Sequence, residues 1–258
     1  MASKQEVLTE LVAMSRHLGE PARDYVILGE GNASARIDDT SFFVKASGAE
    51  FATITAKQFV AMDFDRTLAL LHQEEVGDHQ LREGLLAAQA DPRPELAPSV
   101  ETLLHAALLR EPGVSFVGHT HPVAVNAILC SKGAAEAFGG RIFPDEIVCC
   151  GPAPLYVPYA DPGLPLARSV ITLVARYCKE HSQPPRVILM QNHGAVALGQ
   201  TSREVEVITA MLVKTCRILL GAQAFGGAHF LSPQAASRIW TRPDETPRRD
   251  ALIEKKPG

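Results

Sequence analysis

Three kinds of segment are missing from this sequence of 258 residues. No stretch approaches the roughly 20 consecutive apolar residues that a membrane-spanning helix needs, so we expect no membrane partner. There is no long basic run and no basic patch with interleaved aromatic residues, and the net charge is −4. These features give no electrostatic basis for binding nucleic acid. The first residues are polar and do not resemble a secretory signal.

The five cysteines also lack the pattern of a disulfide framework. Their number is odd, Cys149 and Cys150 are adjacent, and no CxxC pair occurs. Proteins of oxidising compartments that depend on disulfides use regularly spaced, paired cysteines. Buried free thiols in a reducing compartment are therefore favoured over disulfides, and a cytoplasmic location is expected.

Length and composition fit an ordinary globular protein with a full core. Hydrophobic residues make up 46% and charged residues 21% of the chain, as is usual for folded domains. The length suits one large domain or two small ones. We predict a single domain over residues 1–258, with a peripheral C-terminal segment from about residue 223.

Hydrophobic periodicity places helices and strands along the chain. Helices are predicted over 4–18, 101–110, 124–131, 166–180 and 204–220, the last of them stopped by Gly221. Strands are predicted as a hairpin within 25–51, at 114–119, and at 186–190 with 196–199 as its hairpin partner. Residues 56–72 carry mixed signals, and 89–99 are expected to form a surface loop. Residues 144–166 carry six prolines and are expected to be extended and non-helical.

Histidines at two predicted strand ends are the strongest functional signal. His119 and His121 follow the apolar run 114–117, and side chains two apart on a strand point to one face. His193 follows a second apolar run, 187–190. Three neutral imidazoles with an oxygen ligand suit Zn²⁺ or a similar divalent ion. The remaining histidines lack this spacing and are expected to be surface or packing residues: His72, His79, His105, His181 and His229.

Glu101 is the candidate fourth group of this site. It lies in the first turn of a helix that Ser99 can cap, where the helix dipole favours a carboxylate. The 18 residues from Glu101 to His119 leave room for a helix, a turn and a strand that return it to the site. There it can ligate the metal or act as a general base. Taken singly, an HxH pair also fits a packing role, and Glu101 also fits a merely helix-stabilising acid.

A set of small polar residues can form an anion-binding cradle. Gly31 and Asn32 offer a backbone N–H and an amide, Ser47 and Gly48 offer a hydroxyl and another N–H, and Ser99 adds a hydroxyl at a helix N-terminus. The same residues also suit ordinary turns and caps, so the residues alone leave both functions open.

Taken together and in this order, the motifs make the chain resemble the class II aldolase/adducin-head family over about residues 5–222. The matching segments are Gly31-Asn32 with Ser34, Ser47-Gly48, Pro98-Ser99-Val100-Glu101, His119-Thr120-His121-Pro122, Val157-Pro158-Tyr159 and Gln191-Asn192-His193-Gly194. That family includes fuculose- and rhamnulose-phosphate aldolases, ribulose-phosphate 4-epimerase, and related dehydratases and decarboxylases.

The resemblance implies a three-layer α/β/α fold around a largely antiparallel sheet. It implies a Zn²⁺-type site of His119, His121 and His193, with Glu101 as ligand and as acid/base group. It also implies that the small polar residues of the cradle bind substrate, and that the protein is a homotetramer with its sites at subunit interfaces.

Two departures from the family pattern bear on the substrate. Val100 stands where the phosphosugar aldolases carry a second hydroxyl residue, so one phosphate donor is missing and a carboxylate or a non-phosphorylated substrate enters consideration. The fuculose-phosphate aldolases also place tyrosines near residues 144–145 and near the C-terminus, but this chain has no tyrosine after Tyr177. Asp145 and Glu146 can supply acid/base function in the first place, or they can simply begin a turn or helix.

The function predicted from these residues is a metal-dependent lyase. We expect aldol cleavage of a small sugar phosphate or sugar-acid derivative through a metal-stabilised enediolate. The metal motif identifies this intermediate better than the overall reaction, so an epimerase, dehydratase or decarboxylase on the same scaffold remains an alternative. A non-catalytic, adducin-like interaction module is a third alternative, against which the complete histidine set argues.

Overall fold

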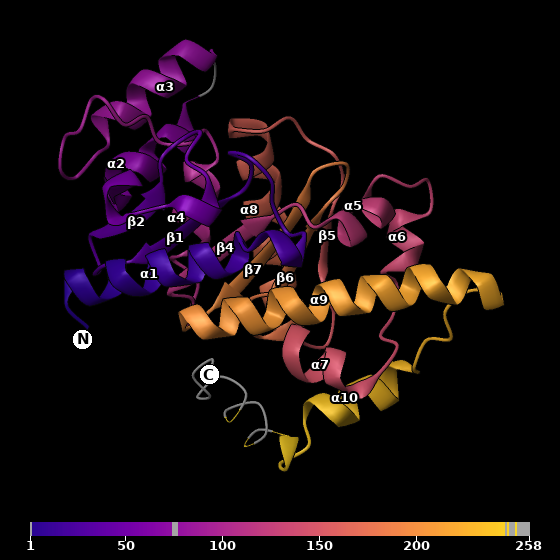
Figure 1. Ribbon diagram of the computed structural model, residues 1–258. Coiled ribbons are helices and arrows are strands. Elements are labelled where there is room, and N and C mark those ends of the chain that lie inside the picture. The colour runs from indigo at the N-terminus through magenta and orange to yellow at the C-terminus, as the bar shows by residue number, and fades with distance from the viewer. Residues whose placement is uncertain (1, 74–76, 246, 248–250, 252–258) are drawn as a thin grey trace.

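The computed structural model describes residues 2–73, 77–245, 247 and 251, and its centre is one mixed sheet (Figure 1). Its seven strands are β1 (Asn32–Arg36), β2 (Ser41–Lys45), β3 (Phe59–Asp63), β4 (Phe116–Thr120), β5 (Leu155–Val157), β6 (Val187–Met190) and β7 (Gly194–Gly199). Their order across the sheet is β3-β2-β1-β4-β7-β6-β5. Only β5 and β6 pair in parallel, and all other neighbours are antiparallel. The predicted largely antiparallel sheet is confirmed.

Helices cover both faces of this sheet, which confirms the predicted three-layer architecture (Figure 1). One face packs against α1 (Lys4–Leu18), α5 (Val123–Leu129) and α9 (Ser202–Ala222). The other packs against α2 (Phe64–Ala69), α3 (Asp78–Ala87), α4 (Thr102–Leu108) and α8 (Leu164–His181). The short helices α6 (Ala134–Ala137), α7 (Pro144–Cys150) and α10 (Pro233–Trp240) complete the set among the described residues.

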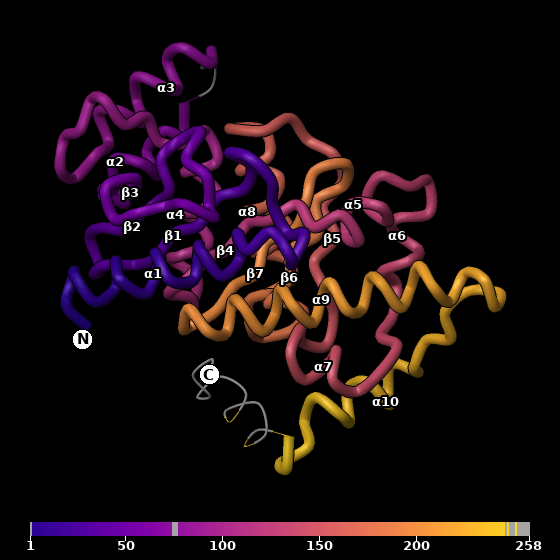
Figure 2. The backbone as a smooth tube through the Cα atoms, viewed as in Figure 1, coloured from indigo at the N-terminus to yellow at the C-terminus, as the bar shows by residue number. Residues whose placement is uncertain are grey.

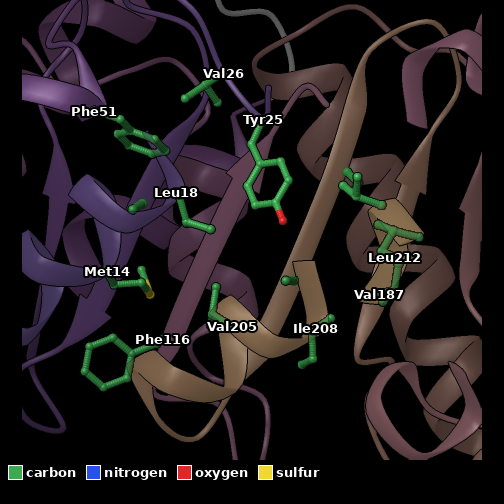
Figure 3. Packing of buried hydrophobic residues seen from close by; sticks show 14 of the residues in the cluster. Met14, Leu18, Tyr25, Val26, Phe51, Phe116, Val187, Val205, Ile208 and Leu212 are labelled. Carbon is green, nitrogen blue, oxygen red and sulfur yellow. The ribbon is translucent and has the colours of Figure 1, made fainter. Parts of the chain in front are cut away.

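The strands supply both cores because their side chains alternate between faces. On β4, Phe116 points into the core under α1 and α9, whereas Val117 points into the core under α4 and α8. Figure 3 shows the first core, to which α1 contributes Leu18 and α9 contributes Val205 and Ile208. Burying each such aliphatic side chain contributes about 1.5–3 kcal/mol, so β4, which carries His119, is held between two packed layers.

The helix predicted over 4–18 from its apolar spacing is confirmed as α1, and the structure shows a capping box at its start. The Ser3 hydroxyl accepts a hydrogen bond from the Glu6 N–H, and the Glu6 carboxylate accepts one from the Ser3 N–H. These reciprocal bonds satisfy two N–H groups that would otherwise lack a partner.

Three predictions about local structure are wrong. Residues 144–150 form helix α7, because Pro144 stands at the first turn, where its missing N–H costs no hydrogen bond. Gly221 does not stop α9, which continues to Ala222. The helix that follows Ser99 begins at Thr102, with Glu101 at its N-cap position and the Ser99 hydroxyl accepting the Glu101 N–H at 3.3 Å.

The ambiguous stretch 56–72 resolves into β3, α2 and short 3₁₀ turns. Helix α3, which ends just before the predicted 89–99 loop, was not predicted from the sequence. Near the C-terminus, α10 packs against α7 through Ile147, Val148, Ala236 and Ile239 (Figure 2). The predicted single domain with a peripheral segment from about residue 223 stays a prediction, and the last part of that segment, 252–258, lies outside the described residues.

No helix among the described residues combines the length and the apolar character needed to cross a membrane. All five cysteines are free thiols. Cys149, Cys150 and Cys216 are buried as expected, but Cys130 is exposed.

Candidate metal centre

The three predicted histidines come together at one end of the central strands. His119 lies on β4 opposite Asn32 of β1. His121 follows the end of β4, and its backbone N–H donates to the Tyr25 carbonyl at 2.9 Å. The nitrogen atoms that His119, His121 and His193 offer to a metal all lie within 4.8 Å of one another. The strand periodicity therefore brings the HxH pair to one face, as the sequence predicts.

A tight hairpin turn carries His193 to the same place. The turn links β6 to β7, and the His193 N–H donates to the Met190 carbonyl at 3.2 Å. Asn192 takes the left-handed conformation with φ of 55°, which asparagine tolerates better than most residues. The Asn126 amide donates to the His193 carbonyl at 2.9 Å and fixes the turn against α5.

Hydrogen bonds set the tautomers of the first two imidazoles. His119 Nδ1 lies 3.0 Å from the Ala195 carbonyl and His121 Nδ1 lies 3.2 Å from the Glu30 carboxylate, so both Nδ1 atoms must carry the proton. Each Nε2 then presents a lone pair, and the two Nε2 atoms face each other at 3.0 Å. Two lone pairs at this distance repel unless a cation lies between them, and nitrogen ligands of tetrahedral Zn²⁺ lie about 3.3 Å apart.

Glu101 reaches the same point from the N-cap of α4. Its Oε1 lies 3.0 Å from His193 Nε2, and its Oε2 lies 3.5 Å from His119 Nε2. Asn32 donates from Nδ2 to Oε2 at 2.6 Å. Oε1, in contrast, is a buried oxygen without a hydrogen-bond partner of good geometry among the described residues. A buried carboxylate oxygen left open beside three imidazoles fits a divalent-metal site.

Burial controls the protonation of these groups. It lowers the pKa of His119 to about 3 and lowers that of His121 as well, so the imidazoles are in the neutral form that binds metal. Burial raises the pKa of Glu101, but His119, His193 and the Asn32 amide act in the opposite direction and leave it below its ordinary value. Neutral imidazoles and an ionised carboxylate are the ligand forms that a divalent cation requires.

Two glycines allow the backbone to approach the imidazoles closely. A Cβ on Gly194 would lie 2.5 Å from His121 Cδ2 and 2.6 Å from the Thr120 carbonyl oxygen. A Cβ on Gly31, which has φ of 65°, would lie 2.6 Å from the His119 carbonyl oxygen. Glycine is therefore required at both positions, Gly194 of the NHG motif and Gly31 of the GN motif, because the histidine cluster packs closely against the backbone there.

The predicted cradle residues gather in neighbouring loops. Ala46 bridges to Pro98, and the Ser47 N–H donates to the Ala97 carbonyl at 2.8 Å. Ser47 and Gly48 are exposed beside the segment that carries Ser99. Gly31 directly precedes β1, and Asn32 begins it. The Asn32 side chain bonds to Glu101 through its nitrogen and contacts His105 through its oxygen. It is therefore not the free amide that the sequence suggests.

Sequence reasoning missed three residues near the site. Glu30 contacts His121, and its position directly before Gly31 is the signal that was available. His105 is fully buried behind Asn32, and its spacing of four from Glu101 puts both on one helix face. The Lys45 ammonium group is buried and donates to the carbonyls of Gly29 and Ala49, at 3.0 and 2.5 Å.

Asp145 and Glu146 begin helix α7, as one of the two predictions had it. Glu146 forms an ion pair with Arg141 at 2.7 Å, and both side chains are 4% exposed. Its other oxygen accepts the Ile142 N–H at 2.9 Å. Glu146 is thus committed to a structural pair.

Comparison with known proteins confirms the family resemblance over most of the chain. Residues 9–220 match the model of the class II aldolase and adducin N-terminal domain. Among solved structures, the N-terminal class II aldolase domain of a conserved protein from Thermoplasma acidophilum is 25% identical, with a TM-score of 0.66. The match covers 85% of this chain and 96% of that one.

Two curated relatives come from Bacillus subtilis (strain 168). An uncharacterized oxidoreductase, YuxG, is 31% identical over 204 residues, or 75% of this chain, but the chain spans only 26% of its length. A methylthioribulose-1-phosphate dehydratase is 28% identical over 211 residues, covering 79% of this chain and 87% of that protein. The chain therefore belongs to the class II aldolase and adducin N-terminal domain family.

Proposed function

We propose that this protein is a divalent-metal-dependent lyase that cleaves a small sugar phosphate or sugar-acid derivative by an aldol-type reaction. The observation that carries the proposal is that the lone pairs of His119 and His121 face each other at 3.0 Å, beside the Glu101 carboxylate. The Oε1 atom of that carboxylate is buried and has no hydrogen-bond partner of good geometry among the described residues. This arrangement has an unfavourable energy without a cation, because buried acceptors that face one another are costly.

His119, His121 and His193 would hold the metal, and Glu101 would complete the set. Three nitrogen ligands and one carboxylate oxygen are the donors that Zn²⁺ takes in catalytic sites, so we propose zinc. When bound, such a cation supplies Lewis-acid polarisation of a substrate oxygen and stabilises developing negative charge.

Glu101 would move the proton in this reaction. Its Oε2 is held by the Asn32 amide, whereas its Oε1 is open and lies beside His193. A carboxylate with one pinned and one open oxygen is oriented for proton transfer at a defined point. Gly31, Asn32, Ser47, Gly48 and Ser99 would bind the substrate, with Val100 removing one hydroxyl from the cradle.

A cavity beside His121 offers space for a small substrate. Its volume is about 400 Å³. Its walls are Asp24, Val26, Ile27, Glu30, His121, Val123, Asn126 and Ala127. Cavities of this size with a few polar groups among apolar side chains are typical of small-molecule sites.

Dehydration is the second candidate reaction. Loss of water next to a carbonyl needs the same stabilisation of negative charge and the same proton transfer as aldol cleavage. It is favoured by the similarity to a methylthioribulose-1-phosphate dehydratase across 87% of that protein. A non-catalytic module, in contrast, has no use for three clustered imidazoles beside an open carboxylate oxygen.

We also propose that the protein assembles as a homotetramer. Ile27, Leu28 and Val123 are 65%, 75% and 60% exposed, and Ile27 and Val123 also line the cavity beside His121. Exposed aliphatic side chains around a site support an interface there. Light scattering coupled to size-exclusion chromatography tests this, and a monomer at micromolar concentration would refute it.

Metal analysis and a product screen test the function. Purified protein should contain about one divalent ion per chain, His119→Ala should lose it, and His79→Ala, which alters an exposed histidine, should keep it. Incubation with ketose phosphates and 3-keto acids, followed by mass spectrometry, should yield an aldehyde fragment for cleavage. Loss of 18 mass units would identify a dehydratase instead, and an unchanged mass with a new stereoisomer would identify an epimerase.

Glu101→Gln separates the two functions of the carboxylate. Because three imidazoles remain, the variant should keep most of its metal, while turnover falls by about 10²–10⁴-fold. If turnover survives with an authentic substrate, the acid/base function of Glu101 is wrong.

A further inference from the structure

We propose that Ser34, His105, Asn32 and Glu101 form a one-way chain of buried hydrogen bonds, in which His105 is the positioning residue for the Glu101 carboxylate. This inference rests on the proposed function of Glu101 and concerns how that side chain is aimed. Ser34 and His105 do not belong to the proposed metal-binding or substrate-binding groups, so they act on the site through Asn32 and Glu101.

The chain joins β1 to α4 in the interior. Ser34 Oγ lies 2.6 Å from His105 Nδ1, His105 Nε2 contacts Asn32 Oδ1, and Asn32 Nδ2 donates to Glu101 Oε2 at 2.6 Å. Ser34 and His105 are 0% exposed and Asn32 is 3% exposed. Water therefore cannot replace a partner, and each contact must be matched between donor and acceptor.

Backbone periodicity explains why four residues from two segments meet in a line. Asn32 and Ser34 are two apart on β1 and so point to the same face of the sheet. Glu101 and His105 are four apart and so share one face at the start of α4. The repeat of two residues in the strand and of about four in the helix therefore places Asn32 and Ser34 against Glu101 and His105.

Only one direction of proton donation satisfies this chain. The ionised Glu101 accepts only, so Asn32 must turn its NH₂ group toward it. Asn32 Oδ1 then faces His105 and must accept, so His105 Nε2 carries the proton. His105 Nδ1 is left with a lone pair, which the Ser34 hydroxyl fills by donating. The opposite tautomer of His105 would put two acceptors in contact at Asn32.

The consequence is that one Glu101 oxygen is occupied and the other is open. Oε2 is held by Asn32, whereas Oε1 lies 3.0 Å from His193 Nε2 but has no hydrogen-bond partner of good geometry among the described residues. Without His105, Asn32 Oδ1 loses its donor, so the Asn32 side chain is free to change its rotamer and no longer holds Glu101 Oε2 in one place. His105 therefore determines which carboxylate oxygen serves the site.

The neutral state of His105 agrees with this direction. The pKa of His105 is lowered to about 4, chiefly by burial and also by the neighbouring Lys45, while Glu101 acts in the opposite direction. The neutral imidazole carries one proton, which Nε2 donates to Asn32, so Nδ1 accepts from the Ser34 hydroxyl.

Nitrogen-15 NMR of histidine-labelled full-length protein at pH 7 tests the direction without a substrate. The His105 resonances, assigned by their loss in His105→Gln, should show a neutral imidazole protonated at Nε2, with Nδ1 as acceptor. A neutral imidazole protonated at Nδ1, or an imidazolium at pH 7, overturns the proposal.

Cobalt binding tests whether the chain aims Glu101. The visible spectrum of bound Co²⁺ responds to the oxygen ligand and not to general stability. His105→Leu, which cannot donate to Asn32, should change this spectrum and weaken Co²⁺ binding by about 10-fold, the usual effect of losing an outer partner of a metal site. His105→Gln places an amide N–H near the position of Nε2 and should restore the wild-type spectrum.

Ser34→Ala is the milder variant if His105→Leu fails to fold. It should move the spectrum in the same direction as His105→Leu. Ser15→Ala is its matched control, because Ser15 is also 0% exposed but its hydroxyl has no hydrogen-bond partner among the described residues. Co²⁺ binding with a wild-type spectrum in folded Ser34→Ala and His105→Leu refutes the positioning function alone, whereas wild-type protein that binds no Co²⁺ refutes the proposed metal site.

Discussion

The Glu30 carboxylate lies 3.2 Å from Nδ1 of His121, on the side of the ring opposite the metal-binding nitrogen. The same carboxylate accepts the Ile27 N–H at 2.7 Å, so the loop before β1 holds it in place. A carboxylate behind a ligating histidine fixes the tautomer and raises the basicity of the ring. Glu30 therefore couples the conformation of this loop to the affinity of His121 for metal.

Replacing Glu30 should weaken metal binding without removing it. Glu30→Ala should lower Zn²⁺ affinity by about 10–100-fold, because His121 loses the acceptor that fixes its tautomer. Glu30→Gln keeps an acceptor oxygen and should lose less. The measurement is competition with a chromophoric chelator. Glu83→Ala is the control, since Glu83 contacts the exposed His79 at 3.4 Å, and an equal loss in both variants would contradict the prediction.

Gly194 should tolerate no side chain. In Gly194→Ala the new Cβ meets His121 Cδ2 and the Thr120 carbonyl at 2.5 and 2.6 Å, so one imidazole must move away. We expect loss of stoichiometric Zn²⁺, measured by elemental mass spectrometry. Gly221→Ala is the matched control: no atom of the described residues lies within 4 Å of the new Cβ, and alanine in α9 should stabilise the fold by about 0.5–1 kcal/mol. Retained metal in a folded Gly194→Ala protein would refute this account of the glycine.

The sequence predicts much of the fold because local patterns agree with the tertiary structure there. The capping box of Ser3 and Glu6 and the apolar spacing of α1 define that helix by themselves. The HxH pair needs only the strand period to place His119 and His121 together. Where one local signal was allowed to outweigh the others, as with the prolines of 144–166, the short helix α7 was missed.

The residues that sequence reasoning missed are those whose function depends on a distant partner. His105 looks like any helix residue until β1 brings Asn32 and Ser34 against it, from about 70 positions away. The function of Glu30 likewise depends on its contact with His121, which lies 91 residues further along the chain. Spacing along one strand or helix is readable in the sequence, but the pairing of β1 with α4 and with the end of β4 is set by the sheet order.

The buried state of His105 predicts a pH dependence of stability in the metal-free protein. The pKa of His105 falls from an ordinary 6.5 to about 4 on folding. Below pH 6.5 the unfolded chain takes up a proton that the folded chain refuses until about pH 4, so stability falls as the pH drops through this window. The difference in the pKa of His105 between the two states corresponds to a loss of about 3 kcal/mol in the free energy of unfolding once the pH is below about 4. Urea unfolding at pH 7 and 4.5 should therefore show a smaller pH effect in His105→Gln than in wild type, and an equal effect would count against a neutral buried imidazole.

The buried pair of Arg141 and Glu146 should serve stability and not catalysis. Glu146→Gln leaves the guanidinium of Arg141 buried without its counter-charge, which costs about 3–5 kcal/mol. Urea unfolding measures this loss, and Asp244→Asn, which breaks an exposed pair with Arg242, should cost far less. Because Glu146 is bound to Arg141 and to the Ile142 N–H, metal affinity and turnover per folded molecule should stay at the wild-type level. A folded Glu146→Gln protein that binds Zn²⁺ normally but has lost turnover would instead assign Glu146 the acid/base function that its place after Pro144 first raised.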